Sequence, residues 1–509
     1  MLFSRFLICN KMLQLLACLF LCCAAIFPNS YGLIDLSNSR KWVCLVFLLC
    51  LYCLFLLFLN AFVKIDIDIK IFWNALIITI FILLFYSVVL CFIDRTSMFV
   101  GSFDNSVGLS LCFALAFSVL AYSVFAKNKY LYYCMGITLV IGIILANSRT
   151  GIICIVCQLL ISKSNFVGRH RVLIATGCVL ILILLWHIKC ASSMGRFFIL
   201  IVAMQMIERH PILGWGIGGF DSHYMSFQAL YFKNNPESQF AILAGNTHHP
   251  LNEFVAIAVD YGLPAMLVVV ILCIYVIWKN CKDGNLILVR VMVCIIVFSL
   301  LSYSLCFPIT ILCLLVVIYE TFKEKFNVIK YKNYLQTGCF LLCVWGLQKV
   351  YNFDKIYTQW SKVATNCVYV VRKSDLLCYE MLTVTKELRN NPRFMYNYAV
   401  TLYDKGEYAK ARKLIDSCLS IYSDYDLELL AGDIYGAQNI DEASVKHYAK
   451  AHDMCPARIM PFFSMYKLYE KRNRLTDMLE IRNQMKTKKL NPHCSHPSCN
   501  SLISNIRIF

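Results

Sequence analysis

The chain has 509 residues, of which 59% are hydrophobic and only 15% are charged. Soluble globular proteins carry roughly 25% charged residues, so this composition excludes an intrinsically disordered chain, a coiled coil and a soluble globular enzyme. The sequence is that of an integral membrane protein. Its formal net charge of +18 would suggest nucleic acid as the partner of a soluble chain. In a membrane protein such a charge instead reflects basic cytoplasmic loops, and we expect no nucleic-acid partner.

Apolar runs close to the ~20 residues that cross a bilayer predict about eleven transmembrane helices within residues 1–351. They lie near residues 12–27, 42–63, 72–93, 106–126, 130–146, 151–162, 172–188, 254–278, 286–305, 307–322 and 336–351. The longest break between spans is a loop at about 189–253. The predicted fold is therefore all-α: a polytopic membrane domain at 1–351, followed by a second domain at 352–509.

The distribution of Lys and Arg predicts the orientation of these spans. With the N-terminus in the cytoplasm, the inner segments hold 15 Lys and Arg in 51 residues, whereas the outer segments of the membrane domain hold 8 in 96. This bias has the direction of the positive-inside rule. We therefore expect the loop 189–253 and the segment 352–509 to lie outside the cytoplasm. Arg40 and Lys41 run against the rule.

Residues 352–509 contain a repeat and no apolar run that could span a membrane. The residues Tyr398-Ala399 and Leu402 are echoed 33 positions later by Ala431-Gly432 and Tyr435. This spacing resembles the 34-residue tetratricopeptide repeat, a helix pair with small residues where the helices touch. Stacked pairs present a concave face, so we expect this domain to bind another molecule, either a substrate that accepts a transferred group or a partner protein. A generic helical hairpin domain is the alternative.

Two arginines lie on the predicted outer side, where the positive-inside rule disfavours them. Arg149 follows the fifth span in Asn147–Gly151, and Arg196 opens an amphipathic segment that we expect to lie on the outer membrane interface. The forked donors of arginine suit phosphate. The structural alternatives are a turn anchor for Arg149 and a side chain that merely reaches the interface for Arg196.

Glycines and histidines also gather in this outer loop. The run His210–Phe220 has four glycines in six residues, among them Gly214, Gly216 and Gly219, which permit close approach of a ligand. His248 and His249 then lead through Asn252 and Glu253 into the next span. A neutral histidine is a natural general base, whereas Asn252 has a plainer role as a helix cap. Together these residues suit a lipid-linked diphosphate and a hydroxyl acceptor.

Four motifs, in this order, resemble the O-antigen ligase and polymerase superfamily over about residues 90–280. They are Gly101-Ser102-Phe103-Asp104-Asn105, then Asn147-Ser148-Arg149-Thr150-Gly151, then Gly195-Arg196 with His210–Phe220, and last His249-Pro250-Leu251-Asn252-Glu253-Phe254 with Tyr261-Gly262. Most members of that family place His directly before the Asn. This chain has Leu251 there, so the nearest histidine is His249, with His248 as the second choice.

The resemblance implies a bacterial inner-membrane glycosyltransferase that moves a glycan from an undecaprenyl-diphosphate carrier to an acceptor hydroxyl on the periplasmic face. The acceptor is a glycolipid, a glycan or a protein. Arg149 and Arg196 would bind the diphosphate, His249 would take the acceptor proton, and Gly214, Gly216, Gly219, Asn252 and Glu253 would support the site. We expect inverting transfer that uses no metal and no cofactor.

Four other functions remain open from the sequence. Within the family, the alternatives to a ligase are a polysaccharide chain polymerase and a protein O-oligosaccharyltransferase. Outside it, the chain is a flippase or transporter of lipid-linked glycans, for which Asp260 and Glu320 in or near spans would speak. A non-catalytic membrane scaffold for the repeat domain is the last alternative, but it leaves the four ordered motifs unexplained.

Overall fold

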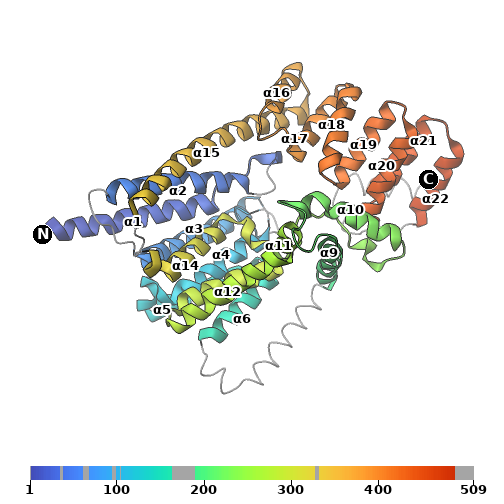
Figure 1. The fold of residues 1–509 in the computed structure, drawn as a ribbon. Helices are drawn as coiled ribbons and strands as arrows, with labels where there is room; N and C mark the ends of the chain where they lie inside the picture. The colour runs from blue at the N-terminus through green and yellow to red at the C-terminus, as the bar shows by residue number, and fades with distance from the viewer. Residues whose placement is uncertain are drawn as a thin grey trace. The chain divides into compact units, whose positions relative to one another are not determined.

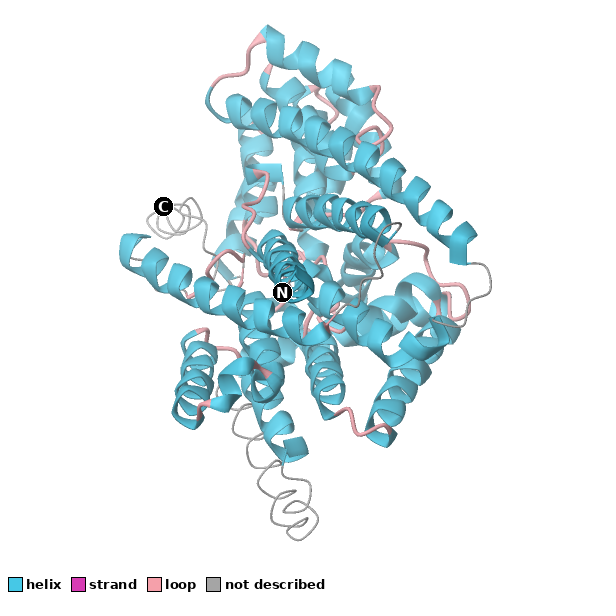
Figure 2. Ribbon diagram, turned by 90° about the vertical axis from the view of Figure 1, so that its left-hand side faces the viewer, coloured by secondary structure: helices cyan, strands magenta, loops and turns pink. Residues whose placement is uncertain are grey.

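The computed structural model describes residues 2–34, 38–60, 68–94, 99–103, 105–162, 190–326 and 332–487. Within these ranges every regular element is a helix and no strand occurs (Figure 2). Four of the described helices are long and apolar enough to cross a membrane, namely Ser39–Leu57, Ile69–Ile93, Cys190–Arg209 and Leu263–Lys282. The predicted all-α fold of a polytopic membrane protein is thus confirmed.

The chain divides into two compact units, and the first comprises Met1–Ile181, Leu251–Glu253 and Val268–Ser361. Its helices, labelled in Figure 1 except for α13, include α1 (Leu2–Ile26), α2 (Ser39–Asn60), α3 (Ile69–Asp94), α4 (Ser106–Val119), α5 (Lys129–Leu145), α6 (Arg149–Ser162), α13 (Leu286–Leu301) and α14 (Pro308–Phe326). Helix α4 contacts α3, α5, α6 and α13, and it is buried along most of its length. Helices that are apolar on all sides, as these are, pack in the core of a bundle or face lipid.

The second unit comprises Leu182–Pro250, Phe254–Leu267 and Lys362–Phe509. Its helices are α9 (Cys190–Arg209), α10 (Gly219–Asn234), α16 (Lys373–Thr383), α17 (Pro392–Asp404), α18 (Tyr408–Ile421), α19 (Tyr425–Ala437), α20 (Asp441–Met454), α21 (Met460–Lys471) and α22 (Leu475–Thr487). Helix α10 packs on both α9 and α20. The segment 190–250 and the C-terminal helices therefore fold together.

Helices α17 to α22 pack in chain order, each against the next. Small buried residues allow this close approach: a Cβ at Gly432 of α19 would lie 2.3 Å from the ring of Tyr448 in α20. Asn391 and Asp424 cap α17 and α19, because each side chain accepts hydrogen bonds from two backbone amides of the first turn. The assignment of these helices to tetratricopeptide repeats remains a prediction.

The boundaries of the helices differ from the predicted spans at several points. The run 254–278 forms two helices, α11 (Glu253–Tyr261) and α12 (Leu263–Lys282), because Gly262 between them has φ +87°. Helix α15 (Lys332–Tyr369) continues through residue 351, where the sequence analysis divides the chain. Helix α9, expected on the membrane interface, is long and apolar enough to cross the membrane. The span near 172–188 lies outside the described residues.

Candidate functional site

His248 precedes α11 and contacts a carboxylate of α10. Its Nδ1 lies 2.9 Å from Oδ1 of Asp221, which belongs to the first turn of α10. The hydroxyl of Tyr422 donates to the same oxygen at 2.7 Å and lies 3.1 Å from Nδ1. The Nε2 atom lies 3.9 Å from Oδ2 of Asp424, which is beyond hydrogen-bond distance. A carboxylate at Nδ1 orients the ring and leaves Nε2 to take a substrate proton.

The two neighbouring histidines have different electrostatic surroundings. The hydrogen bond to Asp221 raises the pKa of His248, although burial opposes this, and the charge of Asp424 raises the pKa further. Burial lowers the pKa of His249, and the charge of Asp221 only partly offsets this. At neutral pH His249 is therefore the more fully uncharged of the two, whereas His248 has the charged partners that stabilise a protonated ring.

The residues after the histidines, Leu251–Glu253, belong to the first unit and form hydrogen bonds within it. Leu251 has φ +55°, in the left-handed region that non-glycine residues rarely adopt. The side-chain amide of Asn252 donates to the carbonyl of Leu300, at 3.1 Å. A carboxylate oxygen of Glu253 accepts the N–H of Leu305, at 2.7 Å. Burial raises the pKa of Glu253 to about 7, and the Leu305 hydrogen bond opposes this rise. Both predicted supporting residues thus make hydrogen bonds within the first unit.

The glycine-rich loop packs against the junction of α11 and α12. The N–H of Trp215 donates to the carbonyl of Val259 at 2.8 Å, and the N–H of Leu263 donates to that of Pro211 at 2.8 Å. A Cβ at Gly214 would lie 2.5 Å from the backbone of Asp260, and one at Gly219 would lie 2.4 Å from Trp215. These glycines allow close packing of the chain on itself. Gly216 has open space beside it, with φ +89°.

Asp260 fixes the other end of this loop. Its carboxylate accepts the backbone N–H groups of Gly218, at 3.2 Å, and Phe220, at 2.9 Å. A negative side chain at the first turn of α10 also interacts favourably with the helix dipole. From the sequence, Asp260 would favour a transporter function. Its hydrogen bonds instead indicate that it holds the start of α10, the helix that carries Asp221.

Gly262→Ala is expected to destabilise this junction strongly. A Cβ at Gly262 would lie 2.0 Å from the carbonyl oxygen of Ile212, and the backbone has φ +87°. The strained φ alone costs about 1–3 kcal/mol, and the clash adds to it. We expect a lower thermal unfolding midpoint for the purified chain. Gly245→Ala is the matched control, because nothing lies within 4 Å of its added Cβ. Equal midpoints for the two variants would contradict the packing role of Gly262.

Arg149 is the first residue of α6, in the first unit. The preceding Ser148 is buried and its hydroxyl accepts two hydrogen bonds, from Ser110 at 2.7 Å and from the N–H of Gly151 at 3.2 Å. Ser148 thereby fixes the first turn of α6 on α4. Arg149 is half-buried at a helix N-terminus, where an anion would also interact with the helix dipole.

Arg196 lies in α9, in the second unit with His248 and His249. It is half-buried. Phe198, two residues after Arg196, packs in the core of this unit. Its ring stacks on that of Phe240, with ring centroids 5.2 Å apart. The packing of Phe198 therefore sets the face of α9 on which Arg196 is carried.

Lys41, which runs against the positive-inside rule, is almost fully buried in the first unit. Its Nζ donates to Oδ1 of Asn38 at 2.9 Å and to the carbonyl of Ser102 at 2.5 Å. It also lies 4.3 Å from the ring centroid of Phe103. Lys41 thus binds the Gly101–Asn105 motif to the start of α2. Asp104 of that motif lies outside the described residues.

Asp221, Tyr422 and Asp424 are the site residues that the sequence analysis did not find. Asp221 has a local signal, an acidic residue in the first helical turn after a glycine run. Tyr422 lies 174 residues from His248 in the chain, and no sequence pattern connects the two. The second unit therefore brings His248 and His249 together with these three residues, while Arg149, Asn252 and Glu253 belong to the first unit.

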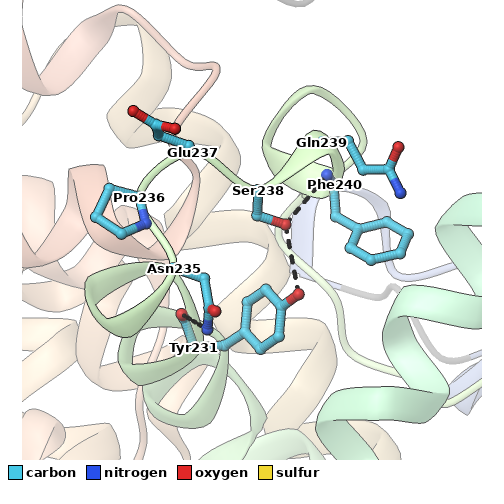
Figure 3. Close-up of a pocket in the computed structure, with 7 residues that line it drawn as sticks. All are labelled: Tyr231, Asn235, Pro236, Glu237, Ser238, Gln239 and Phe240. Carbon is cyan, nitrogen blue, oxygen red and sulfur yellow. Dashed lines mark hydrogen bonds between the residues drawn. The ribbon is translucent and has the colours of Figure 1, made fainter.

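A surface hollow lies elsewhere in the second unit, at the end of α10 (Figure 3). It is lined by Tyr231, Asn235, Pro236, Glu237, Ser238, Gln239 and Phe240. The hydroxyl of Ser238 accepts the N–H of Phe240 at 3.3 Å and lies 3.4 Å from that of Tyr231. No residue predicted from the sequence lines it. Over the described part of the chain, no group of three or more His, Cys, Asp or Glu residues is placed to hold a metal ion.

Part of the chain is similar to a known protein family. Residues 134–270 match the family model described as O-antigen ligase. The match begins in α5 and ends in α12, so it includes Arg149, Arg196 and both histidines but none of α16–α22. No curated protein matches the chain. Over residues 134–270, the chain is thus similar to the O-antigen ligase family.

Proposed function

We propose that the chain transfers a glycan from an undecaprenyl-diphosphate carrier to an acceptor hydroxyl, on the periplasmic face of a bacterial inner membrane. The observation that carries this proposal is the O-antigen ligase match at residues 134–270, which includes both arginines and the His248–Asp221 pair. The proposed orientation has the N-terminus in the cytoplasm and the C-terminal helices in the periplasm, as the Lys and Arg distribution favours.

The proposed reaction is a single inverting displacement. The acceptor oxygen attacks the anomeric carbon while its proton passes to a histidine, and the bond from that carbon to the phosphate oxygen breaks. The undecaprenyl diphosphate leaves with the bonding electron pair. Arg149 and Arg196 bind this diphosphate and offset the charge that develops on it, a type of stabilisation worth about 3 kcal/mol for each donor. Of the three supporting glycines, Gly216 is the one with open space beside it for a ligand.

The geometry favours His248 over His249 as the general base. Asp221 holds Nδ1 of His248, which fixes the ring and stabilises the imidazolium that forms when Nε2 accepts a proton. His249, the first choice from the sequence, has a pKa lowered by burial, so it is uncharged at neutral pH but a weaker base. Both remain candidates, and the pH dependence of transfer separates them.

The pH profile of kcat/KM is expected to identify the histidine. A base works in its neutral form, so activity rises with pH through the pKa of the base. If His248 is the base, the acid limb lies above the ordinary histidine value of 6.5, because the partners of His248 raise its pKa. If His249 is the base, the limb lies below 6.5, because burial lowers its pKa. Asp221→Asn is expected to move a His248 limb to lower pH. An acid limb below 6.5 that Asp221→Asn leaves in place would exclude His248.

Transfer is also expected to need no divalent cation. Two arginines replace the charge that a metal would supply at the leaving diphosphate. The purified full chain should therefore keep its transfer rate after treatment with EDTA and in metal-free buffer. Loss of activity with EDTA, restored by magnesium or manganese, would exclude the metal-free mechanism.

A ligase, a chain polymerase and a protein O-oligosaccharyltransferase share this chemistry and differ in the acceptor. Deleting the gene and identifying the glycosylated product that disappears separates them: a glycolipid core for a ligase, longer repeats of the same glycan for a polymerase, and a glycoprotein for an oligosaccharyltransferase. We favour the ligase, because the matched family model is that of O-antigen ligase.

A further inference from the structure

The C-terminal helices share a hydrophobic core with the outer loop. Phe220 and Tyr224 of α10 lie in the same buried cluster as Tyr425, Met454 and Cys455 of the C-terminal segment. These contacts fall within one compact unit. Removal of apolar surface from water stabilises such packing. The position of the C-terminal helices relative to α10 is therefore set by packing.

Hydrogen bonds fix the turn between α18 and α19 on α10. The N–H of Ser423 donates to the carbonyl of Ser222 at 2.9 Å, and the hydroxyl of Ser226 donates to that of Ser423 at 2.7 Å. Further along α10, the side chain of Gln228 donates to the carbonyl of Met454 at 2.6 Å. Ser423 is flanked by the two residues that face His248, so these bonds determine where Tyr422 and Asp424 lie.

Asp424 uses its two oxygens for different purposes. One oxygen, Oδ1, accepts the N–H groups of Asp426 at 2.8 Å and Leu427 at 3.3 Å, and so caps α19. The other, Oδ2, accepts the side-chain amide of Asn246 at 2.8 Å and lies 3.9 Å from Nε2 of His248. At 3.9 Å the carboxylate does not occupy the Nε2 lone pair, yet it is close enough to stabilise a proton there.

We propose that the C-terminal domain completes the site: Tyr422 and Asp424 are positioning residues that set the orientation and basicity of His248. This inference rests on the proposed function and extends it to a part of the chain that the family match does not reach. Tyr422 donates to the same Asp221 oxygen that holds Nδ1 of His248. It therefore competes with the His248 ring for that oxygen and lowers the basicity of the ring. Asp424 acts in the opposite sense, because its charge favours the protonated ring.

Substitution of these two residues should therefore shift the pKa of His248 in opposite directions. Tyr422→Phe removes the competing hydroxyl and raises the pKa of His248. Asp424→Asn lowers it, since an amide keeps the oxygen that caps α19 but carries no charge. The charged and titratable groups that face the ring are Asp221 of α10, Tyr422 and Asp424 of the turn, Asp426 of α19, Arg393 of α17 and the neighbouring His249. The four groups other than Tyr422 and Asp424 are unchanged in both variants.

The test measures the protonation of His248 in the full chain without reference to turnover. Diethyl pyrocarbonate modifies neutral imidazole, so the pH at which modification of His248 is half-maximal reports its pKa. Mass-spectrometric fragmentation of the peptide assigns the modification to His248 and not to the adjacent His249. We expect this midpoint, and the acid limb of kcat/KM, to move to higher pH in Tyr422→Phe and to lower pH in Asp424→Asn, with a several-fold loss of kcat in both. The matched control is Tyr435→Phe, which removes the 3.0 Å hydrogen bond from a Tyr to Asp416 away from the site.

Each result decides the inference. Opposite shifts in the two variants, with the control unchanged and thermal midpoints near that of the parent chain, support it. Unshifted midpoints of modification in both variants overturn it, even if the parent chain transfers glycan. A parent chain that transfers no glycan overturns the proposed function, while the modification midpoints still report whether Tyr422 and Asp424 act on His248.

Discussion

His248→Asn is expected to lower kcat for glycan transfer by about 10²–10⁴-fold, the usual contribution of a general base. The amide nitrogen of Asn superposes on Nδ1 of the ring, so the variant keeps a donor for Asp221 and loses only the Nε2 base. The contact between α10 and the residues before α11 is thereby retained. The measurement is the rate of transfer by the purified full chain, together with its thermal unfolding midpoint.

Two controls separate loss of the base from loss of structure. His248→Gln places an amide near the Nε2 position but removes the donor to Asp221, so it should be equally inactive and less stable. His210→Ala removes an exposed histidine of the glycine-rich loop, in the same unit, and should keep most of the activity. Full activity in His248→Asn would exclude His248 as the base and leave His249, for which His249→Asn should then abolish transfer.

Arg149→Ala is expected to lower kcat/KM about 100-fold. Loss of one charged donor to a developing diphosphate costs about 3 kcal/mol, and each ~1.4 kcal/mol is a factor of ten in rate. Arg149→Lys should recover only part of this loss, because a lysine keeps the charge but not the fork of donors that matches a phosphate. Transfer rates over a range of carrier concentrations give the comparison.

Arg40→Ala is the control for this pair of variants. Arg40 is an exposed arginine of the same unit and lies on the same predicted side of the membrane, so its removal changes the general charge without touching the site. It should keep nearly full activity. Arg196→Ala should show a loss similar to that of Arg149→Ala. If Arg149→Ala and Arg196→Ala both transfer at more than half the parent rate, the arginines do not bind the diphosphate.

The type of fold could be predicted from the sequence because the signal is strong and local. Apolar runs of about 20 residues have one stable solution in a bilayer, a helix that satisfies its own backbone hydrogen bonds. The break at Gly262 was not predicted, although Gly262 and the nearby Pro264 are a local signal for the end of a helix. The break arises because Gly262 packs against the carbonyl of Ile212, which lies 50 positions earlier in the chain.

The candidate site could be predicted only in part. His248 and His249 are visible as a pair in a loop, and Arg149 stands out because it opposes the positive-inside rule. The partners of His248 are not visible in this way, because Asp221 and Tyr422 lie 27 and 174 residues away and meet it only through packing. Lys41 stands out in the sequence because its charge opposes the positive-inside rule. Its contacts with Ser102 and Phe103 are visible only in the structure.

Reconstituted transfer is the most direct test of the proposed activity. The purified full chain, placed in lipid nanodiscs with an undecaprenyl-diphosphate-linked glycan, a hydroxyl acceptor and EDTA, should form a product whose new glycosidic bond has the inverted anomeric configuration. His248→Asn should form almost none. If no acceptor receives the glycan, while the chain in sealed liposomes moves the lipid-linked glycan from one leaflet to the other, the protein is a transporter and the glycosyltransferase account is wrong.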